Sequence, residues 1–401
     1  MKVLISGASI AGPVLAYWLS RHGFDVTVVE RSPALRKTGG HAVDLFRPAM
    51  EISERMGVLS DIEAHATGTT EMLIHRPGTS RPAHLDYLKI IGAMSDRHVE
   101  IMRDDLSEIY FNASRDDVEY LFGDTITSIS PDGDVTFEHN APRRFDVVVG
   151  ADGLHSGVRR LTFGDNVSER FLGGYLSVVS VPKALARDGE MTGYFKPGHM
   201  AGIYTADHLD DARAVFIFRP GQRLDYDYRD VERQKAQLCA AFAHTAPEVD
   251  RWLDEVPQTP TFYFDAITQL QMTTWSRGRV TLVGDAGYCP GPAVGGSTSL
   301  AVYGAYVLAA EMVRAGDDYA AAFAAYERTM LPPVEGSRKL AAVNAKTVVP
   351  TTGWGIRALV AAGQLISALP LGVTQALARL NDKGVRLYDT MPLPAWPAAL
   401  P

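Results

Sequence analysis

Residues 3–13 read VLISGASIAGP, and this stretch decides the fold of the N-terminal part of the chain. The run VLIS predicts a short buried strand, and the glycines at positions 7 and 12 predict a tight turn into a helix over residues 13–22. The run DVTVVE at residues 25–30 predicts a second strand. Strand, helix and strand together form a βαβ unit, which is typical of a parallel sheet in an α/β protein.

The turn of this unit has the spacing of a dinucleotide-binding fingerprint. Gly7 permits the tight turn and Gly12 lets the helix pack closely on the strand, while Ser9 takes the place of the middle glycine. The Ser9 hydroxyl can bond a phosphate oxygen. The backbone amides of Ile10 and Ala11, at the start of the helix, are expected to bind a diphosphate with the help of the helix dipole.

Glu30 ends the second strand, at the place where a carboxylate accepts hydrogen bonds from an adenosine ribose. Glu30 and its neighbour Arg31 are therefore expected to contact a cofactor. A glycine turn without any ligand is the alternative interpretation of the unit. The unit by itself also leaves NAD and FAD equally open.

Two later motifs distinguish FAD from NAD. The stretch DVVVGADG at residues 146–153 places Asp152 and a glycine after a buried strand, and GRVTLVGDA at residues 278–286 places Asp285 after another. A carboxylate just past the end of a strand suits a sugar or ribityl hydroxyl. The small residues beside it let a long cofactor lie against the backbone.

With these three motifs in this order, the chain resembles the single-component FAD-dependent aromatic monooxygenases, the family typified by para-hydroxybenzoate hydroxylase. The resemblance covers nearly the whole chain, whose length is similar to that of the hydroxybenzoate hydroxylases and the tetracycline-inactivating monooxygenases. It implies an α/β fold: a Rossmann-like FAD-binding domain of the GR2 flavoprotein type, an inserted and mainly β-sheet substrate domain, and C-terminal helices.

The expected domain boundaries follow the change of sequence pattern. The FAD-binding domain is assigned residues 1–68, 97–170 and 275–335; the substrate domain is assigned 69–96, which reads as a hairpin, and 171–274; a helical segment covers 336–401. Helices are predicted over residues 300–315 and 319–331.

The resemblance also implies cofactor contacts for individual residues. Asp285 is expected at the ribityl chain and Arg103 at the diphosphate and ribityl region, while Asp152 is expected to support the diphosphate region and the docking of NAD(P)H. The segment from Gly39 through Asp44 and Arg47 is expected to run past the flavin ring.

The family's loop over the isoalloxazine corresponds here to Pro292, Gly295 and Gly296. The loop departs from the family pattern, because Tyr288 stands at the usual His and Ser299 at the usual Asn; Ser297 also replaces a loop glycine. No side chain is nominated as a catalytic base, and Arg47, Tyr288 and Pro292 are expected to line the reaction centre.

The function that the resemblance implies is an NAD(P)H- and O2-dependent hydroxylase. NADPH or NADH reduces bound FAD as a transient partner, O2 adds at the flavin C4a position, and the hydroperoxide transfers one oxygen atom to an electron-rich aromatic, phenolic or polycyclic (polyketide- or antibiotic-like) small molecule. The alternatives are a flavin- or nucleotide-binding sensor or accessory protein without turnover, motivated by Ser9, Ser297 and Ser299, and an NAD-dependent dehydrogenase, which explains only the first 30 residues.

Composition narrows the function classes. Of 401 residues, 46% are hydrophobic and 21% charged, which excludes a disordered or fibrous chain, and the net charge of −8 disfavours nucleic-acid binding. The two cysteines, Cys239 and Cys289, are too few for a disulfide framework or a zinc site and fit a cytoplasmic setting. No metal and no membrane span are expected, and a monomer and a homodimer are equally open.

Alternating aromatic residues mark the strands of the second domain. One face of that sheet must be core, and the other face could form the wall of a substrate cavity. Cys289 is expected to be a packed, inert thiol, and His41 and His155 to form local hydrogen bonds. The aromatic residues in question are Tyr194, Phe195, Tyr204, Phe216, Phe218, Phe262 and Phe264.

Overall fold

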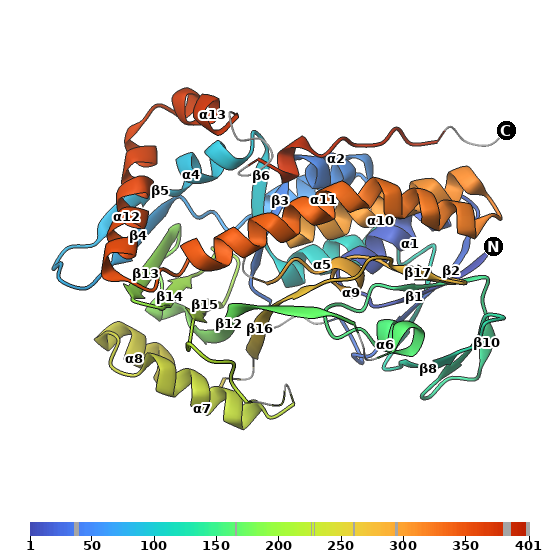
Figure 1. Cartoon of the computed structure of the whole chain (residues 1–401), viewed down its shortest axis with the longest axis horizontal. Coiled ribbons are helices and arrows are strands. Elements are labelled where there is room, and N and C mark those ends of the chain that lie inside the picture. Colours follow the sequence, from blue (N-terminus) through green and yellow to red (C-terminus); the bar gives the residue numbers. More distant parts are fainter. Residues whose placement is uncertain are drawn as a thin grey trace.

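The computed structural model describes residues 1–35, 40–164, 167–225, 227, 229–259, 261–292, 296–379 and 386–397. These residues form an elongated molecule with a sheet at the centre of each half (Figure 1). Among them, no helix is both long and apolar enough to cross a lipid bilayer.

The first sheet has six strands and contains the predicted βαβ unit. Strand β1 lies between β2 and β11, and every pair is parallel except the one that involves β17. Its strands β1, β2, β7 and β11 are apolar runs, because helices cover both faces of a parallel sheet. In sheet order the strands are β17 (Ser276–Arg277), β18 (Val280–Leu282), β11 (Val147–Gly150), β1 (Lys2–Ser6), β2 (Asp25–Glu30) and β7 (Glu119–Phe122).

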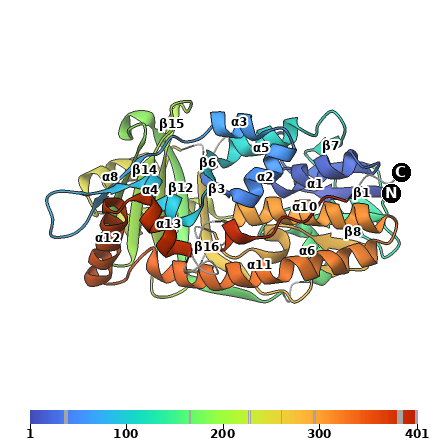
Figure 2. The ribbon, with the colours of Figure 1, turned by 90° about the horizontal axis from the view of Figure 1, so that it is seen from above.

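Helices and two small sheets surround this first sheet. Helix α10 lies in the core against α1, and α11 runs alongside α10 (Figures 1 and 2). The helices of this half are α1 (Ala11–Ser20), α2 (Arg47–Arg55), α3 (Leu59–Ala64), α5 (Arg103–Asn112), α6 (Gly157–Phe163), α9 (Asp285–Tyr288), α10 (Ser297–Ala315) and α11 (Tyr319–Thr347). The small sheets pair β3 (Ala42–Phe46) with β6 (His98–Met102), and join β8 (Ile126–Ile129), β9 (Asp134–Phe137) and β10 (Arg143–Arg144).

The second sheet has seven strands and takes its members from two distant parts of the chain. The predicted hairpin forms strands β4 and β5 and joins the sheet through β13, to which β4 is parallel. In sheet order the strands are β16 (Phe262–Leu270), β12 (Glu169–Pro182), β15 (Asp211–Phe218), β14 (His199–Tyr204), β13 (Glu190–Lys196), β4 (Glu71–His75) and β5 (Ala83–Asp86).

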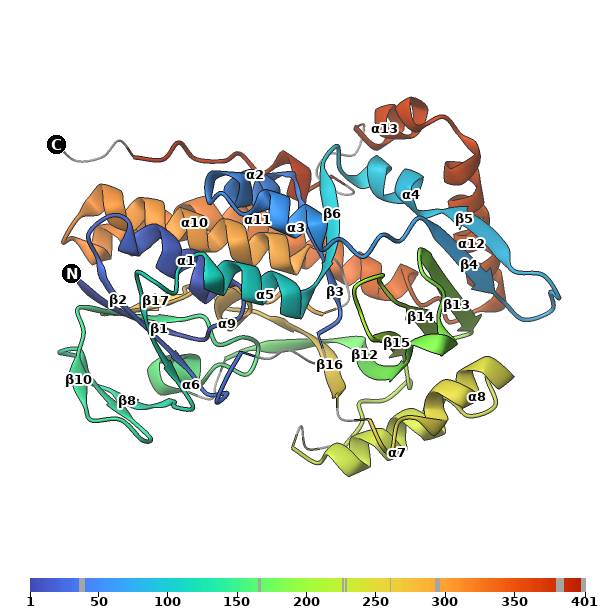
Figure 3. The same ribbon diagram turned by 180° about the vertical axis from the view of Figure 1, so that it is seen from behind.

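Two groups of helices pack on the seven-stranded sheet, one on a face and one at its hairpin end. Helices α7 (Val231–Phe242) and α8 (Pro247–Asp254) pack on one face, and α4 (Tyr87–Met94), α12 (Gly353–Ala368) and α13 (Leu371–Arg379) lie at the hairpin end (Figure 3). Short 3-10 turns occupy Lys183–Leu185 and Tyr388–Thr390.

The C-terminal segment 386–397 returns to the first half of the molecule. The hydroxyls of Tyr303 and Tyr306 on α10 donate to the carbonyls of Pro392 (2.8 Å) and Pro394 (3.1 Å). The Trp396 ring packs on Trp18 of α1, with 4.3 Å between ring centroids. The segment therefore lies as an extended strap across the nucleotide-binding half, as Figure 1 shows.

Candidate functional site

The two glycines of the fingerprint turn are required by close backbone contacts. Gly7 has φ +109°, and a Cβ atom there would lie 2.5 Å from the carbonyl oxygen of Ala151. A Cβ on Gly12 would lie 1.9 Å from the carbonyl oxygen of Gly7. Any larger residue at either position would push β1, α1 and the β11 turn apart.

A positive charge faces the start of α1. Arg103 donates from Nη2 to the Ser9 hydroxyl oxygen at 3.1 Å, and the Ser107 hydroxyl donates to the Ser9 carbonyl at 3.0 Å. Helix α1 begins at Ala11, and no side chain caps it at Ile10. The amides of the first turn and the guanidinium together form the kind of surface that binds a diphosphate.

Glu30 fastens the end of β2 to this turn. Its two carboxylate oxygens accept hydrogen bonds from the amides of Ala8 (3.0 Å) and Ser32 (2.9 Å). A carboxylate has further lone pairs, so Glu30 can still accept from ribose hydroxyls. Arg31, by contrast, has an exposed side chain just after the strand.

Asp152 supports the fingerprint turn through its own backbone. Its carboxylate accepts from the amides of Gly157 (2.8 Å) and Val158 (3.1 Å) and from the Ser156 hydroxyl, so it fastens the β11 turn to the N-terminus of α6. The Cα atom of Asp152 would lie 3.0 Å from a Cβ on Gly7. Asp152 therefore fixes the turn on which the fingerprint rests.

Asp285 is the first residue of α9, and the positive charge of Arg103 acts on its carboxyl. Burial raises the pKa of its carboxyl, against the opposing effect of the positive charge of Arg103 and of a hydrogen bond with the Cys289 thiol. Asp285 as a whole residue is nevertheless partly accessible to solvent. A carboxyl in this position suits the hydroxyls of a ribityl chain.

The Cys289 thiol stays protonated in this setting. Burial and the negative charge of Asp285 raise its pKa well above the usual value, and Cys289 is only 2% exposed. A thiol without thiolate character is unreactive, as expected for a packed cysteine.

The segment that leads into β3 connects the two sheets. Arg213 of β15 donates from Nε to the Gly40 carbonyl at 3.0 Å, and the amide of Ala42 donates to the Tyr204 hydroxyl of β14 at 2.7 Å. The Gly40 amide in turn donates to Asp104 Oδ2 at 2.8 Å. Gly39 lies outside the described residues.

His41 lies between these two anchors and faces Tyr263 of β16. The ring centroids are 6.1 Å apart. Burial and the positive charge of Arg103 lower the pKa of His41 to about 4, and burial raises the pKa of Tyr263 well above its usual value. Both rings are therefore neutral at physiological pH, at the point where the second sheet meets Arg103 and Asp285.

Asp44 and Arg47 lie further along the same segment. Asp44 accepts from His98 Nε2 at 2.8 Å through its carboxylate, and from the Ser299 hydroxyl at 3.0 Å through its carbonyl. The amide of Phe46 donates to the same Ser299 hydroxyl at 2.9 Å. The serine at position 299 thus connects β3 to the start of α10. The Arg47 side chain is exposed, with Nε 3.8 Å from Glu51 Oε1.

The loop between α9 and α10 packs on the second sheet. A Cβ on Gly291 would lie 3.2 Å from Leu172 and 3.5 Å from Ile267, and Pro292 is half-buried beside it. Gly295 lies outside the described residues. Helix α10 then begins at Ser297 without a side-chain cap, which leaves its first amides for a ligand.

Position 296 must be glycine because the Tyr388 ring lies against it, a contact that no sequence motif predicts. Gly296 has φ +77°, and a Cβ there would lie 2.0 Å from the Tyr388 ring of the C-terminal strap. Tyr388 stacks on Phe46 with 5.7 Å between centroids, and burial raises its pKa to about 12. Tyr388 lies far in sequence from every motif, so the sequence alone did not predict its contact with Gly296.

Tyr288, which was expected to line the reaction centre, is buried in the core. It is 1% exposed and packs on Trp275, with 5.0 Å between centroids. Its hydroxyl accepts from the Tyr326 hydroxyl at 3.1 Å, in the core under α10. The side chain fills space opened by Gly304, where a Cβ would lie 1.9 Å from the Tyr288 hydroxyl.

The two faces of the second sheet differ in composition. Phe216, Phe218 and Phe264, three of the predicted aromatic positions, belong with Tyr175 to the core under α7 and α8, so this aromatic face is the core face. The opposite face carries a cluster of buried aliphatic side chains. Partly exposed residues pack against this cluster. This aliphatic face consists of Leu176, Val178, Ile217 and Ile267. Val349, just after α11, is buried in the same cluster, and packed around it are Leu172, Met200, Val215, Tyr263 and Val348.

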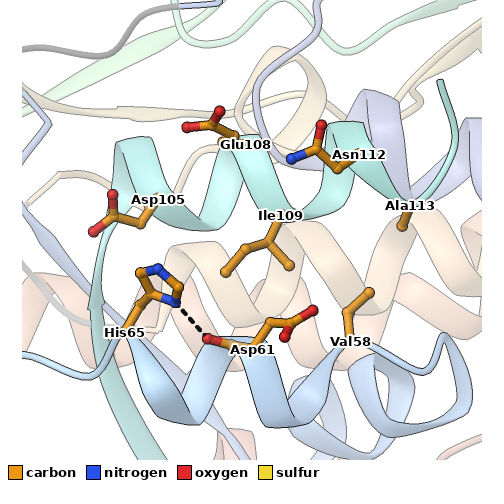
Figure 4. Close-up of a pocket in the computed structure, with 8 residues that line it drawn as sticks. All are labelled: Val58, Asp61, His65, Asp105, Glu108, Ile109, Asn112 and Ala113. Carbon is orange, nitrogen blue, oxygen red and sulfur yellow. Dashed lines mark hydrogen bonds between the residues drawn. The ribbon is translucent and has the colours of Figure 1, made fainter.

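Two surface hollows lie outside this junction. One, of about 380 Å³, lies between α3 and α5 and is lined by Asp61, His65, Asp105 and Glu108 (Figure 4). Its carboxylates disfavour an anionic cofactor. The other, of about 190 Å³, lies beside the pair of His155 Nε2 and Asp265 Oδ2, which are 2.9 Å apart.

No metal centre emerges from the part of the chain that the structure describes, where no three His, Cys, Asp or Glu side chains gather suitably. The arrangement at the junction instead fits a long dinucleotide. It combines a glycine turn with free helix amides, a central guanidinium, a reachable buried carboxyl and an apolar wall.

Comparison with known proteins gives matches over most of the chain. Residues 1–333 match the family described as FAD binding domain. The chain is 36% identical over 343 residues to a flavin-dependent monooxygenase of Legionella longbeachae, covering 84% of this chain and 87% of that protein. It is 43% identical over 349 residues to the uncharacterized protein Rv1260 of Mycobacterium tuberculosis, covering 85% and 93%.

A solved structure matches the whole fold. The tetracycline destructase Tet(55) superimposes with a TM-score of 0.83 and 31% sequence identity, and the match covers 98% of both chains. The predicted fold class, an α/β flavoprotein fold with an added sheet and C-terminal helices, is confirmed by these matches.

Proposed function

Because this chain belongs to the FAD binding domain family and is a flavin-dependent monooxygenase, we propose that it uses NAD(P)H and O2 to hydroxylate an electron-rich aromatic, phenolic or polycyclic small molecule. The observation that carries the proposal is the junction itself. There, Arg103 donates to Ser9 of the fingerprint turn, and its charge acts on Asp285 and on Tyr263 beside the aliphatic face of the second sheet.

The residues present fit FAD. Gly7 and Gly12 hold the turn tightly between β1, α1 and the β11 turn, and Arg103 with the α1 amides would neutralise the charge of a diphosphate bound there. Asp285 would hold the ribityl chain, and the first amides of α10 would face the polar end of the ring. Bound FAD would supply the redox chemistry, accepting a hydride and activating O2.

The aliphatic face would bind and orient the substrate. Leu172 and Ile267 on this face contact the loop that carries Gly291, so an apolar ring placed there lies beside the position expected for the flavin. The partly exposed Met200, Val215 and Leu172 would exclude water from the reacting atoms. A flat aliphatic wall suits a planar ring system.

His41 and Tyr263 would set the protonation and orientation of that ring. Since both are neutral, they can exchange hydrogen bonds with a phenol or enol hydroxyl without adding a full charge to the site. The more electron-rich form of the substrate, which reacts with an electrophilic oxygen, can then form within a hydrogen-bonded site. A polycyclic substrate is supported by the match to a tetracycline destructase.

The test combines an absorption spectrum with reductant consumption. Purified protein should show flavin bands near ~370 and ~450 nm, and NADPH or NADH oxidation should rise when a suitable phenol or polycyclic enol is added. Mass spectrometry should find the product heavier by one oxygen atom.

Three results would argue against the proposal. A colourless protein that FAD cannot reconstitute would show that FAD is not its cofactor. A yellow protein that binds aromatic ligands but never oxidises NAD(P)H would be a sensor. Oxidation without any oxygenated product across both single-ring and polycyclic panels would reject the substrate class.

A further inference from the structure

Charge is unevenly distributed along the chain. Residues 336–379 contain five Lys and Arg residues and not one Asp or Glu, although the whole chain has a net charge of −8. This segment forms the end of α11 and helices α12 and α13. The cations Lys346, Arg357 and Arg379 are all exposed on it.

The same segment exposes large apolar side chains. On α12, Trp354 is 78% exposed and Leu365 is 61% exposed, and Leu88 on the neighbouring α4 is 59% exposed. Leu371 and Val373 of α13 are exposed as well. Isolated exposed leucines are ordinary on protein surfaces, but a tryptophan with several leucines on three adjoining helices indicates a binding surface.

Helix α12 is apolar on both of its sides. Its inner side packs Ile356 and Val360 against the protein, and Gly363 faces Leu85 of β5. Its outer side carries Trp354 and Leu365, which are eleven residues apart and therefore share one face of an α-helix, with Arg357 between them. Two large apolar side chains exposed beside a cation indicate a contact surface.

Helices α4, α12 and α13 lie together at one end of the molecule, far from α6 and the N-terminus (Figures 1 and 3). The acids next to α4 are already paired. Asp86 caps that helix and lies 3.7 Å from Lys89, and Asp96 is bridged by Arg386 at 2.6 Å. Arg379 lies 3.4 Å from the same Asp96, whereas Arg357 and Lys346 face solvent.

The positive charge of this surface distinguishes between two kinds of partner, a second copy of the chain and an anionic lipid surface. A second copy of the chain would place this cationic face against itself across a two-fold axis, and like charges at the centre of such an interface are unfavourable. An anionic lipid surface offers opposite charge to Arg357 and Lys346, and acyl chains to Trp354 and Leu365. Tryptophan and cations flanking leucines are the usual composition of a helix that lies in a membrane interface.

We propose that the outer faces of α4, α12 and α13, with Trp354 and Leu365 at their centre, form a docking surface for an anionic phospholipid bilayer. The contact is peripheral and reversible. It brings the enzyme to the surface in which apolar ring compounds dissolve, and it does not depend on the identity of the substrate.

The experiment uses the full-length chain loaded with FAD. It is sedimented with vesicles of phosphatidylcholine containing about one quarter phosphatidylglycerol, and with vesicles of phosphatidylcholine alone. Binding is expected only to the anionic vesicles, and raising the salt from about 0.05 M to about 0.5 M should weaken it because the charges are screened. The double variant Trp354→Ser, Leu365→Ser should lower the partition coefficient about ten-fold or more.

Leu161→Ser is the matched control, because Leu161 is a similarly exposed leucine on α6 at the other end of the molecule. It should bind vesicles as the unaltered chain does. The conservative Trp354→Phe should keep binding and lose the fluorescence that brominated acyl chains quench, a measurement that does not rely on a disruptive substitution.

Three outcomes would overturn the proposal. The first is no sedimentation with anionic vesicles, and the second is equal binding by the double variant and the control. The third is a concentration-dependent dimer that Leu365→Glu dissociates, which would assign the face to a second copy of the chain.

Discussion

Asp285 combines burial, partial accessibility and a neighbouring guanidinium, and it is the residue on which cofactor binding should depend most. We predict that Asp285→Ala purifies largely without flavin, because the ribityl hydroxyls lose their acceptor and the Arg103 charge loses a partner. The loss of one charged hydrogen-bond partner costs about 1.5–3 kcal/mol, or roughly a 10- to 100-fold rise in the FAD dissociation constant.

The ratio of flavin to protein absorbance, followed by FAD titration of the apoprotein, measures this effect. Asp116→Ala is the control, since the Asp116 carboxylate is 91% exposed. Asp285→Asn should retain part of the affinity because its amide still accepts a hydrogen bond. Full FAD retention by Asp285→Ala would contradict the assignment.

His41 should give the apoprotein a specific sensitivity to acid. Its pKa is about 4 in the folded chain and near 6.5 when exposed, so the unfolded chain binds more protons between these values and the free energy of unfolding falls as pH falls. From pH 8 to pH 5 the loss due to His41 is about 2 kcal/mol.

Urea unfolding of the apoprotein at the two pH values provides the measurement. His41→Gln should lose less stability on acidification than the unaltered chain, and the exposed His84→Gln should behave like the unaltered chain. Identical acid sensitivity of all three proteins would show that His41 is not buried in its neutral form.

At the scale of elements, the C-terminal strap is held by the absence of a side chain on Gly296. Gly296→Ala should displace the Tyr388 ring and lower the free energy of unfolding by about 2–4 kcal/mol, because a steric clash adds to the cost of a positive φ. Gly316→Ala measures the cost of the positive φ without the steric clash, since Gly316 has φ +60° and a Cβ added there would meet nothing within 4 Å.

Chemical denaturation and limited proteolysis together test this prediction. The strap of Gly296→Ala should be cleaved faster than that of Gly316→Ala, and the added substitution Tyr388→Ala should recover part of the lost stability. Equal destabilisation by the two glycine substitutions would mean that Tyr388 does not occupy this space.

Helix α11 shows how packing overrides local preference. The sequence pattern predicted a helix over residues 319–331, yet the helix continues through Pro332 and Pro333 to Thr347. Met330 and Val334, on either side of the prolines, are fully buried. Their burial offsets the roughly 3 kcal/mol that a proline costs inside a helix.

At the scale of the whole molecule, two hydrogen bonds connect the halves through the segment before β3. Tyr204→Phe removes the acceptor of the Ala42 amide and should lower the free energy of unfolding by about 1–3 kcal/mol, because that amide is left without its partner. FAD affinity should fall too, since His41 and Asp44 lie on the same segment.

Thermal unfolding with and without FAD tests this connection. Tyr319→Phe, a similar substitution at a half-buried tyrosine on α11, is the control and should change neither quantity by much. Unchanged stability and FAD affinity in Tyr204→Phe would show that the two halves are connected elsewhere.

The sequence determined the parts of this protein that depend on neighbours in the chain. The glycine turn, the strand ending at Glu30 and the carboxylates after β11 and β18 follow from local rules of backbone geometry, and the family resemblance then supplied the cofactor. The β4–β5 hairpin was predicted for the same reason.

Only the tertiary structure decided what depends on contacts between distant segments. It placed the aromatic face of the second sheet against α7 and α8 and the aliphatic face toward the loop that carries Gly291, which alternation alone left open. It also buried Tyr288 in the core and brought Tyr388 onto Gly296. Periodicity tells which residues share a face, but what covers that face is fixed by packing between elements that lie far apart in the sequence.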